Sequence, residues 1–113
     1  MYTNIKNLPL EGNVYFTERG YSQSYPWVVI SRSESGKTLT LAKVKVAADP
    51  EWKPEFHIGG FAAHCSNQSE QTWLFDEIDY EYTTQIRLTK KGWSHKGTRF
   101  TEDRAVEFYD YNF

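Results

Sequence analysis

The chain lacks several features that would assign it at once to a class of protein. It has 113 residues and one cysteine, Cys65, so an internal disulfide is impossible and a reducing compartment fits best. No apolar run approaches the length of a membrane span, and no N-terminal apolar segment is typical of a signal peptide. We therefore expect a soluble cytoplasmic protein with no membrane partner. A chain of this length buries a core without metal or disulfide support.

The chain also lacks an excess of basic charge. Its 13 lysines and arginines stand against 15 acidic residues, which gives a formal net charge of −2. Proteins that hold duplex nucleic acid electrostatically usually carry a marked basic excess. Nucleic acid is therefore a disfavoured partner, although a local basic patch is compatible with this total.

No stretch of eleven or more residues has a helical period, whereas 17% of the residues are aromatic. Tyrosine and phenylalanine favour strands and are also enriched in binding surfaces. We therefore predict an all-β fold, a small antiparallel barrel or a strongly twisted sheet, with a long irregular loop in the middle. Residues 1–11 are interpreted as an N-terminal arm, either pinned by Tyr2, Ile5 and Leu8 or mobile. Residues 12–113 form a single β domain.

Alternation and turn residues predict strands at 12–17, 26–31, 37–46, 71–75 and 80–90. The segment 26–31 is apolar on both faces, so we expect a central strand covered on both sides. Turn residues 33–36 pair it with 37–46, and Gly36 can adopt positive φ. Segment 47–67 is the long loop, with a short strand around 56–58.

Two strands make specific predictions about their faces. In 37–46, Leu39 and Leu41 share one parity whereas Val44 and Val46 have the other. A bulge or twist near Ala42 and Lys43 would direct all four to one core. In 80–90, alternation places four side chains on one covered face, namely Tyr80, Tyr82, Ile86 and Leu88.

Catalytic and metal motifs are incomplete in this sequence. Gly36-Lys37-Thr38 ends like a phosphate-binding P-loop, but Ser31 stands where the first glycine is required and a strand pattern follows. The spacing of zinc ligands is missing among His57, His64, Cys65 and His95. Nothing orients a base toward the cysteine. We expect no enzyme activity, no cofactor and no metal.

The C-terminal part of the chain interleaves basic and aromatic residues. Arginine forks bind phosphate in a bidentate way, and aromatic faces stack on bases. An acidic run at 76–81 repels phosphate, so a nucleotide site should lie elsewhere. The candidate ligand-binding residues are Lys91, Trp93, Arg99, Phe100, Arg104 and Tyr109. The alternative interpretation is ordinary, with charges on a wet face and aromatics in the core.

Several segments of residues 27–113 together resemble a group of small proteins of tailed phages. The matching segments are Val29-Ile30, Ser35 to Thr40, Gly59 to Trp73, Lys91 to Trp93, Gly97 to Arg99, and the ending Phe108 to Phe113. The group is in turn similar to phage anti-Thoeris sponge proteins. These are β-rich oligomers that sequester cyclic ADP-ribose signals, and in some cases cyclic oligonucleotides, without degrading them.

The resemblance implies a non-enzymatic anti-defence protein in the host cytoplasm that captures a small cyclic nucleotide as a homo-oligomer. It also implies that Arg99 and Arg104 are phosphate ligands, with a nearby aromatic side chain stacked on the base. The alternative hypothesis is a protein-binding inhibitor of a host defence factor. Its exposed aromatic and acidic side chains would then form the interface.

Overall fold

The computed structural model describes residues 1–59 and 62–112, and for residues 57–59, 62 and 63 it describes the backbone alone. Gly60 and Phe61 of the middle segment and the terminal Phe113 lie outside the described residues. Strands are the main secondary structure of the described chain, which confirms the all-β prediction, and it holds no helix long and apolar enough to cross a membrane. Its elements are β1 (Tyr2–Thr3), β2 (Ile5–Lys6), β3 (Tyr15–Arg19), β4 (Ser24–Arg32), β5 (Thr38–Ala48), β6 (Phe56–Gly59), β7 (Ala62–Cys65), the 3-10 turn η1 (Gln68–Glu70), β8 (Trp73–Thr89), β9 (Gly92–His95), β10 (Thr98–Glu102) and β11 (Arg104–Ala105).

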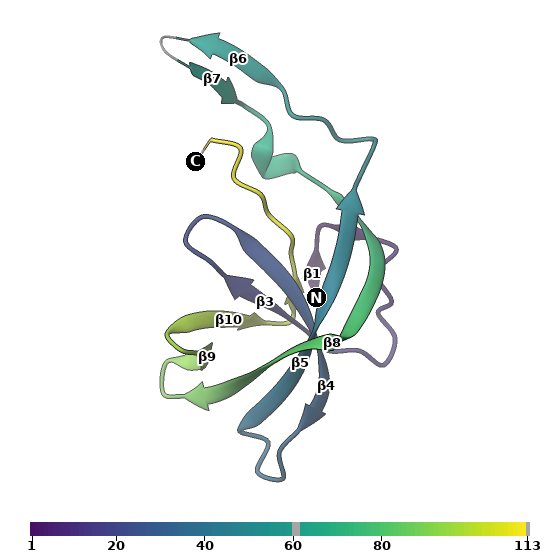
Figure 1. Cartoon of the computed structure of the whole chain (residues 1–113), viewed down its shortest axis with the longest axis vertical. Helices are drawn as coiled ribbons and strands as arrows, with labels where there is room; N and C mark the ends of the chain where they lie inside the picture. Colours follow the sequence, from purple (N-terminus) through teal and green to yellow (C-terminus); the bar gives the residue numbers. More distant parts are fainter. Residues whose placement is uncertain (60–61, 113) are drawn as a thin grey trace.

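Six of the strands are hydrogen-bonded in a ring (Figure 1). Its order is β8-β5-β4-β3-β10-β9, and β9 pairs back with β8. All pairs within this ring are antiparallel, as predicted. Two short parallel pairs are added by the N-terminal arm, which places β2 beside β8 and β1 beside β11.

Successive residues of a strand point to opposite faces of the sheet. Buried side chains cover both faces here, in two separate clusters. Inside the ring lies one cluster of buried side chains, made of Phe16, Trp27, Leu39, Leu41, Ile86 and Phe100. On the outer face lies a second cluster, made of Ile5, Leu8, Tyr15, Val28, Ala42, Val44 and Ala105. Trp27 and Val28 are neighbours in β4 and belong to different clusters, so the predicted double cover of 26–31 is confirmed for residues 26–28. It is wrong for Ile30 and Ser31, which are exposed.

The N-terminal arm covers part of the outer face. Ile5 and Leu8 are buried in the outer cluster, as predicted. Tyr2 remains exposed, but the Arg104 guanidinium lies 4.7 Å from the centre of its ring. The arm is therefore an ordered part of the fold and not a mobile tail.

The predicted irregularity near Ala42 and Lys43 is confirmed in position, but its extra residues belong to the partner strand β8. The register between β5 and β8 shifts there, since Ala42 lies opposite Thr83 and Lys43 lies opposite Asp79. The prediction that one core would receive all four apolar side chains of β5 is wrong in detail. Leu39 and Leu41 point into the ring, whereas Val44 and Val46 join the outer cluster.

The same bulge corrects the prediction for residues 71–90. One 17-residue strand, β8 (Trp73–Thr89), replaces the two separate strands predicted at 71–75 and 80–90. Residues 80–82 have no partner on β5, so Tyr80 and Tyr82 are 65% and 61% exposed and not covered. Ile86 is the buried member of the predicted face, and Leu88 is exposed as well. The bulge interrupts the alternation of β8 at residues 80–82, so one regular alternation does not describe the whole segment 80–90.

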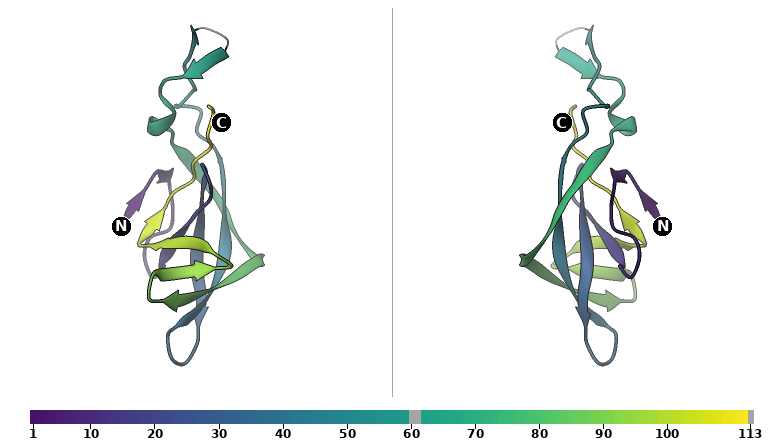
Figure 2. Two further views of the ribbon diagram at one scale, coloured as in Figure 1. Left: turned by 90° about the vertical axis from the view of Figure 1, so that its left-hand side faces the viewer. Right: turned by 90° about the vertical axis from the view of Figure 1, so that its right-hand side faces the viewer.

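The middle segment projects from the ring as a separate hairpin of β6 and β7 (Figures 1 and 2). The predicted short strand around 56–58 is confirmed as β6, and the irregular part of the loop reduces to 49–55. The C-terminal segment leaves the ring and runs up to this hairpin. Two hydrogen bonds join their ends, since the Asn112 carboxamide accepts from the Cys65 N–H and donates to the Cys65 carbonyl.

Candidate functional site

The structure brings together three of the six predicted ligand-binding residues. Lys91, Trp93 and Arg99 line a cavity of about 350 Å³ between the β8–β9 turn and the β9–β10 turn. Arg104 lines a different cavity of about 320 Å³, beside the turn that joins β3 and β4. Both cavities lie at the lower end of the size range of small-molecule sites.

The other two predicted residues lie elsewhere. Phe100 is only 5% exposed and belongs to the cluster inside the ring. Tyr109 is part of the C-terminal segment, where its ring centre lies 4.8 Å from that of Tyr111. Tyr111 in turn contacts Trp52 and Phe56 near the projecting hairpin. Neither residue shares a cavity with Arg99.

The two basic cavities are connected by a line of arginines across four adjacent strands. Arg87 of β8 lies opposite Ser94 of β9, which lies opposite Arg99 of β10, which lies opposite Arg19 of β3. We call Arg19, Arg87 and Arg99 the arginine row. Phe100, which follows Arg99 in β10, points into the ring of strands. The side chains of the arginine row therefore lie on the outer face of the sheet. Arg19 at one end lines the same cavity as Arg104, and Arg99 lines the other.

Sequence reasoning missed Arg19. It lies between the strands predicted at 12–17 and 26–31, and it stands far from the C-terminal basic residues along the chain. Only the pairing of β3 with β10 brings Arg19 opposite Arg99. No local pattern in the sequence indicates that pairing.

The arginine row is electrostatically unbalanced. In the described part of the chain, ion pairs are made by the N-terminus, Lys6 and Lys45, and none involves Arg19, Arg87 or Arg99. Like charges directly opposite on neighbouring strands are destabilising. Guanidinium groups bind phosphate and carboxylate through paired N–H donors, so an anion lying across Arg19 and Arg99 would relieve this repulsion.

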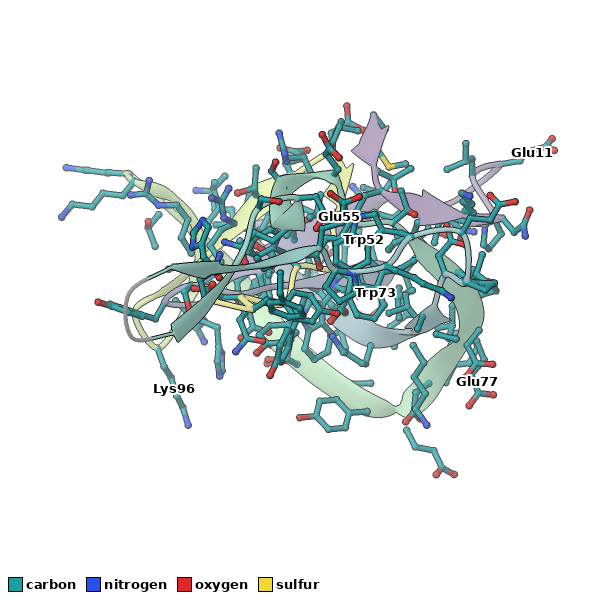
Figure 3. All side chains as sticks on the ribbon, turned by 90° about the horizontal axis from the view of Figure 1, so that it is seen from above. Glu11, Trp52, Glu55, Trp73, Glu77 and Lys96 are labelled. Carbon is teal, nitrogen blue, oxygen red and sulfur yellow. The ribbon has the colours of Figure 1, made fainter. Side chains whose placement is uncertain are left out.

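The acidic run of β8 lies away from this surface. Figure 3 shows Lys96, from the β9–β10 turn, and Glu77 pointing outward on opposite sides of the molecule. Glu77 and Asp79 pair instead with Lys45, at 3.5 and 3.4 Å. An anion that approaches the β9–β10 turn therefore does not meet the carboxylates of Glu77 and Asp79.

Arg104 is held differently from the arginine row. Its guanidinium stacks on the Tyr2 ring, and its buried Nε atom has no hydrogen-bond partner among the described residues. The cavity beside it is also lined by Ser22, Gln23 and Phe108. Arg104 is thus a half-buried cation that lines this cavity.

Trp93 has a structural role besides bordering its cavity. Its ring meets Phe16 edge-on at 5.6 Å between ring centres, inside the ring of strands. The indole therefore contributes to the core, and the basic part of this cavity comes from Lys91 and Arg99.

The described histidine and cysteine side chains do not form a metal site. The described residues include no group of three His, Cys, Asp or Glu side chains that could hold a metal ion. Cys65 is buried, and its thiol donates to Asn67 Oδ1 at 3.4 Å. The side chain of His57 lies outside the described residues.

Comparison of the chain with family models, with curated proteins and with solved structures finds no match. The candidate site is therefore argued from the geometry of the chain itself. Its defining feature is the arginine row, with one basic cavity lined by Arg19 and another lined by Arg99.

Proposed function

We propose that the protein is a non-enzymatic phage anti-defence protein that acts in the host cytoplasm. It captures a small cyclic nucleotide immune signal, of the cyclic ADP-ribose type or a cyclic oligonucleotide, and sequesters it. The observation that carries this proposal is Arg19 facing Arg99 across β3 and β10, with no ion pair to either in the described residues. Such a pair favours a ligand that brings its own negative charge.

Capture requires phosphate contacts and a pocket for the rest of the ligand. The arginine row offers the phosphate contacts, and Lys91 adds a further cation beside Arg99. The cavity at Arg104 offers hydrogen-bonding groups from Ser22 and Gln23 and an aromatic wall from Phe108. Both cavities are shallow enough that a second copy of the chain would complete them, so we propose a homo-oligomer.

Isothermal titration with cyclic ADP-ribose isomers and with cyclic di- and trinucleotides tests the proposal. We expect binding at micromolar ligand, loss of binding in Arg19→Ala and in Arg99→Ala, and retention in Arg32→Ala. Arg32 is a matched control because it is an exposed arginine of β4 outside the row. Absence of binding to every ligand would overturn the proposal.

Sequestration also predicts that the ligand is unchanged. After heat denaturation of the complex, chromatography should return the intact nucleotide in stoichiometric amount. A hydrolysed product would show that the protein is an enzyme and would contradict this part of the proposal.

One observation favours a second candidate function, inhibition of a host defence factor by direct binding. The bulge in β8 exposes Tyr80 beside the exposed carboxylates of Asp76, Glu77 and Glu81. Exposed tyrosines next to acidic groups are suited to a basic protein partner. Recovery of one host protein in stoichiometric amount, lost in Tyr80→Ala and retained in Arg99→Ala, would favour this function over the first.

A further inference from the structure

A cavity of different character opens on the other face of the sheet. It has a volume of about 300 Å³ and is lined by Glu18, Trp27, Tyr82, Thr83, Thr84, His95, Thr98 and Phe100. Trp27 and Phe100 belong to the cluster inside the ring, so this cavity lies at the inner face whereas the arginine row lies at the outer face. We call it the aromatic cavity.

Three aromatic rings form the wall of the aromatic cavity. The ring centres of Trp27 and Tyr82 are 5.8 Å apart at an interplanar angle of 42°, and those of Trp27 and Phe100 are 6.4 Å apart at 60°. None of these pairs is a parallel stack, so the ring faces are turned toward different directions around one space. Tyr82 is 61% exposed, whereas Trp27 and Phe100 are each 5% exposed, so Tyr82 presents most of the accessible ring surface.

The bulge of β8 is what places Tyr82 on this wall. Pairing with β5 resumes only at Thr83, so residues 80–82 are free of the strand ladder on that side. Thr83 and Asp79 lie opposite two neighbouring residues of β5, Ala42 and Lys43. Residues 80–82 of β8 are therefore the extra residues of the bulge. A bulge next to a cavity commonly redirects a side chain for a functional reason.

The acidic side chain that lines the aromatic cavity is Glu18. Glu18 Oε1 accepts a hydrogen bond of 2.9 Å from the Trp27 indole N–H, which fixes the carboxylate at the edge of the tryptophan ring. No lysine or arginine lines the cavity. The faces of aromatic rings are themselves electronegative, so rings and carboxylate attract the same kind of ligand.

The protein already holds one cation on these rings. The Lys43 ammonium lies 5.4 Å from the centre of the Trp27 ring and 4.8 Å from that of Tyr25. Its Nζ atom is buried and has no hydrogen-bond partner among the described residues. The Tyr25 and Trp27 ring faces and the negative charges of Glu107 and Glu18 together favour this ammonium against the cost of its burial.

We propose that the aromatic cavity binds the quaternary ammonium group of a small organic cation. Such a group has no hydrogen-bond donors, so it needs only ring faces and a nearby negative charge, and both are present here. The small volume restricts the ligand to a headgroup of a few carbon atoms around the nitrogen. This site is independent of the proposed nucleotide site because it lies on the opposite face of the sheet.

Calorimetric titration of the full chain with tetramethylammonium and with choline tests the site. The control ligand is 3,3-dimethylbutan-1-ol, which has the shape of choline and no charge. We expect both cations to bind and the neutral control to bind much more weakly. Tyr82→Ala should weaken choline binding about fivefold, the effect of one accessible cation–π contact. Tyr80→Ala, which changes a neighbouring exposed tyrosine outside the cavity, should leave binding unchanged.

Glu18→Gln provides a second variant that keeps the acceptor for the Trp27 indole N–H and removes the charge. It should weaken both cations and leave the neutral control unaffected, whereas Arg99→Ala should affect neither. Equal binding of choline and its neutral isostere would overturn the proposal, because it would indicate an apolar cleft. Absence of cation binding at high millimolar concentration would overturn it too, as would unchanged binding in both Tyr82→Ala and Glu18→Gln.

Discussion

The side chain of Gln71 pairs with the backbone of Tyr109 as a strand neighbour would. Gln71 Oε1 accepts from the Tyr109 N–H at 2.9 Å, and Gln71 Nε2 donates to the Tyr109 carbonyl at 2.9 Å. The remaining acceptor and donor positions of the same carboxamide are taken by the Trp73 indole N–H and the Gln68 carbonyl. A side chain that is 2% exposed thus satisfies its full hydrogen-bonding capacity.

Other side chains bind the C-terminal segment in the same way. Asn4 accepts from the N–H of Glu107 and donates to its carbonyl, and Gln68 accepts from the N–H of Tyr111. The intervening residue Phe108 exchanges both backbone hydrogen bonds with Ser24 on the opposite edge. The segment is therefore an extended strand with side-chain amides in place of a neighbouring backbone along one edge.

Gln71→Ala should destabilise the protein by about 2–3 kcal/mol, because it leaves buried backbone groups of Tyr109 and the Trp73 indole N–H without partners. Urea denaturation followed by tryptophan fluorescence measures the change. Gln85→Ala is the control, since Gln85 is an exposed glutamine of β8 and its loss should change the free energy of unfolding little. Equal stability of the two variants would contradict the role of Gln71.

The sequence predicted what depends on local patterns and missed what depends on distant pairing. Turn residues and alternation identified the β4–β5 hairpin and the bulge at Ala42 because those signals lie within one stretch of chain. The carboxamide contacts of Gln71 could not be predicted, since any polar residue before a strand is compatible with a loop. The position of Arg19 required the β3–β10 register. The exposure of Tyr82 required the length of the bulge.

Glu107 should make the protein less stable at neutral pH than at mildly acidic pH. Burial raises the pKa of Glu107 above its usual value, and the nearby Lys43 ammonium only partly opposes this. The folded state therefore binds a proton more readily than the unfolded state, and stability falls as pH rises from about 4.5 through the raised pKa. Glu107→Gln should be more stable than the wild type at pH 7, with the difference shrinking toward pH 4.5.

Urea midpoints at the two pH values measure this effect. The backbone contacts of Glu107 with Asn4 remain in the variant, so the comparison isolates the charge. Glu102→Gln is the control, because Glu102 is an exposed glutamate of β10. A variant that is less stable than the wild type at pH 7 would show that the carboxylate is favourable in the folded state.

The contribution of Asp49 to the stability of the protein should depend on pH in the opposite way. Hydrogen bonds from Lys6 Nζ at 2.8 Å, from Thr72 Oγ1 at 2.6 Å and from the Glu51 N–H at 3.0 Å lower the pKa of Asp49 to about 2. Its contribution is present above the unfolded value of 3.8 and is lost as pH falls from there through about 2. Asp49→Asn should therefore flatten the stability curve across that window, as measured by thermal unfolding. Asp76→Asn, at an exposed position, should leave the curve unchanged.

Removing one member of the arginine row should stabilise the unliganded protein at low salt. Arg99→Thr abolishes the like-charge contact with Arg19 and keeps a residue suited to a strand, so we expect a gain of roughly 0.2–1 kcal/mol. The gain should vanish near 1 M salt, where screening shortens the range of the repulsion to about 3 Å. Arg32→Thr, outside the row, should show no such gain. A loss of stability in Arg99→Thr at low salt would mean that Arg99 has a favourable contact in the folded state.

The C-terminal segment should control the reactivity of Cys65. Asn112 brackets the Cys65 peptide group with hydrogen bonds of 2.8 and 2.9 Å, and the thiol is 1% exposed. Asn112→Ala should therefore speed the reaction of Cys65 with a soluble disulfide reagent, and deletion of residues 108–113 should speed it more because we expect the deletion to unfold the protein. Glu70→Ala, at an exposed position of η1, is the control and should react at the wild-type rate. If Asn112→Ala also reacts at the wild-type rate, the barrier to the thiol comes from β6 and β7 alone, and the segment does not close this end of the fold.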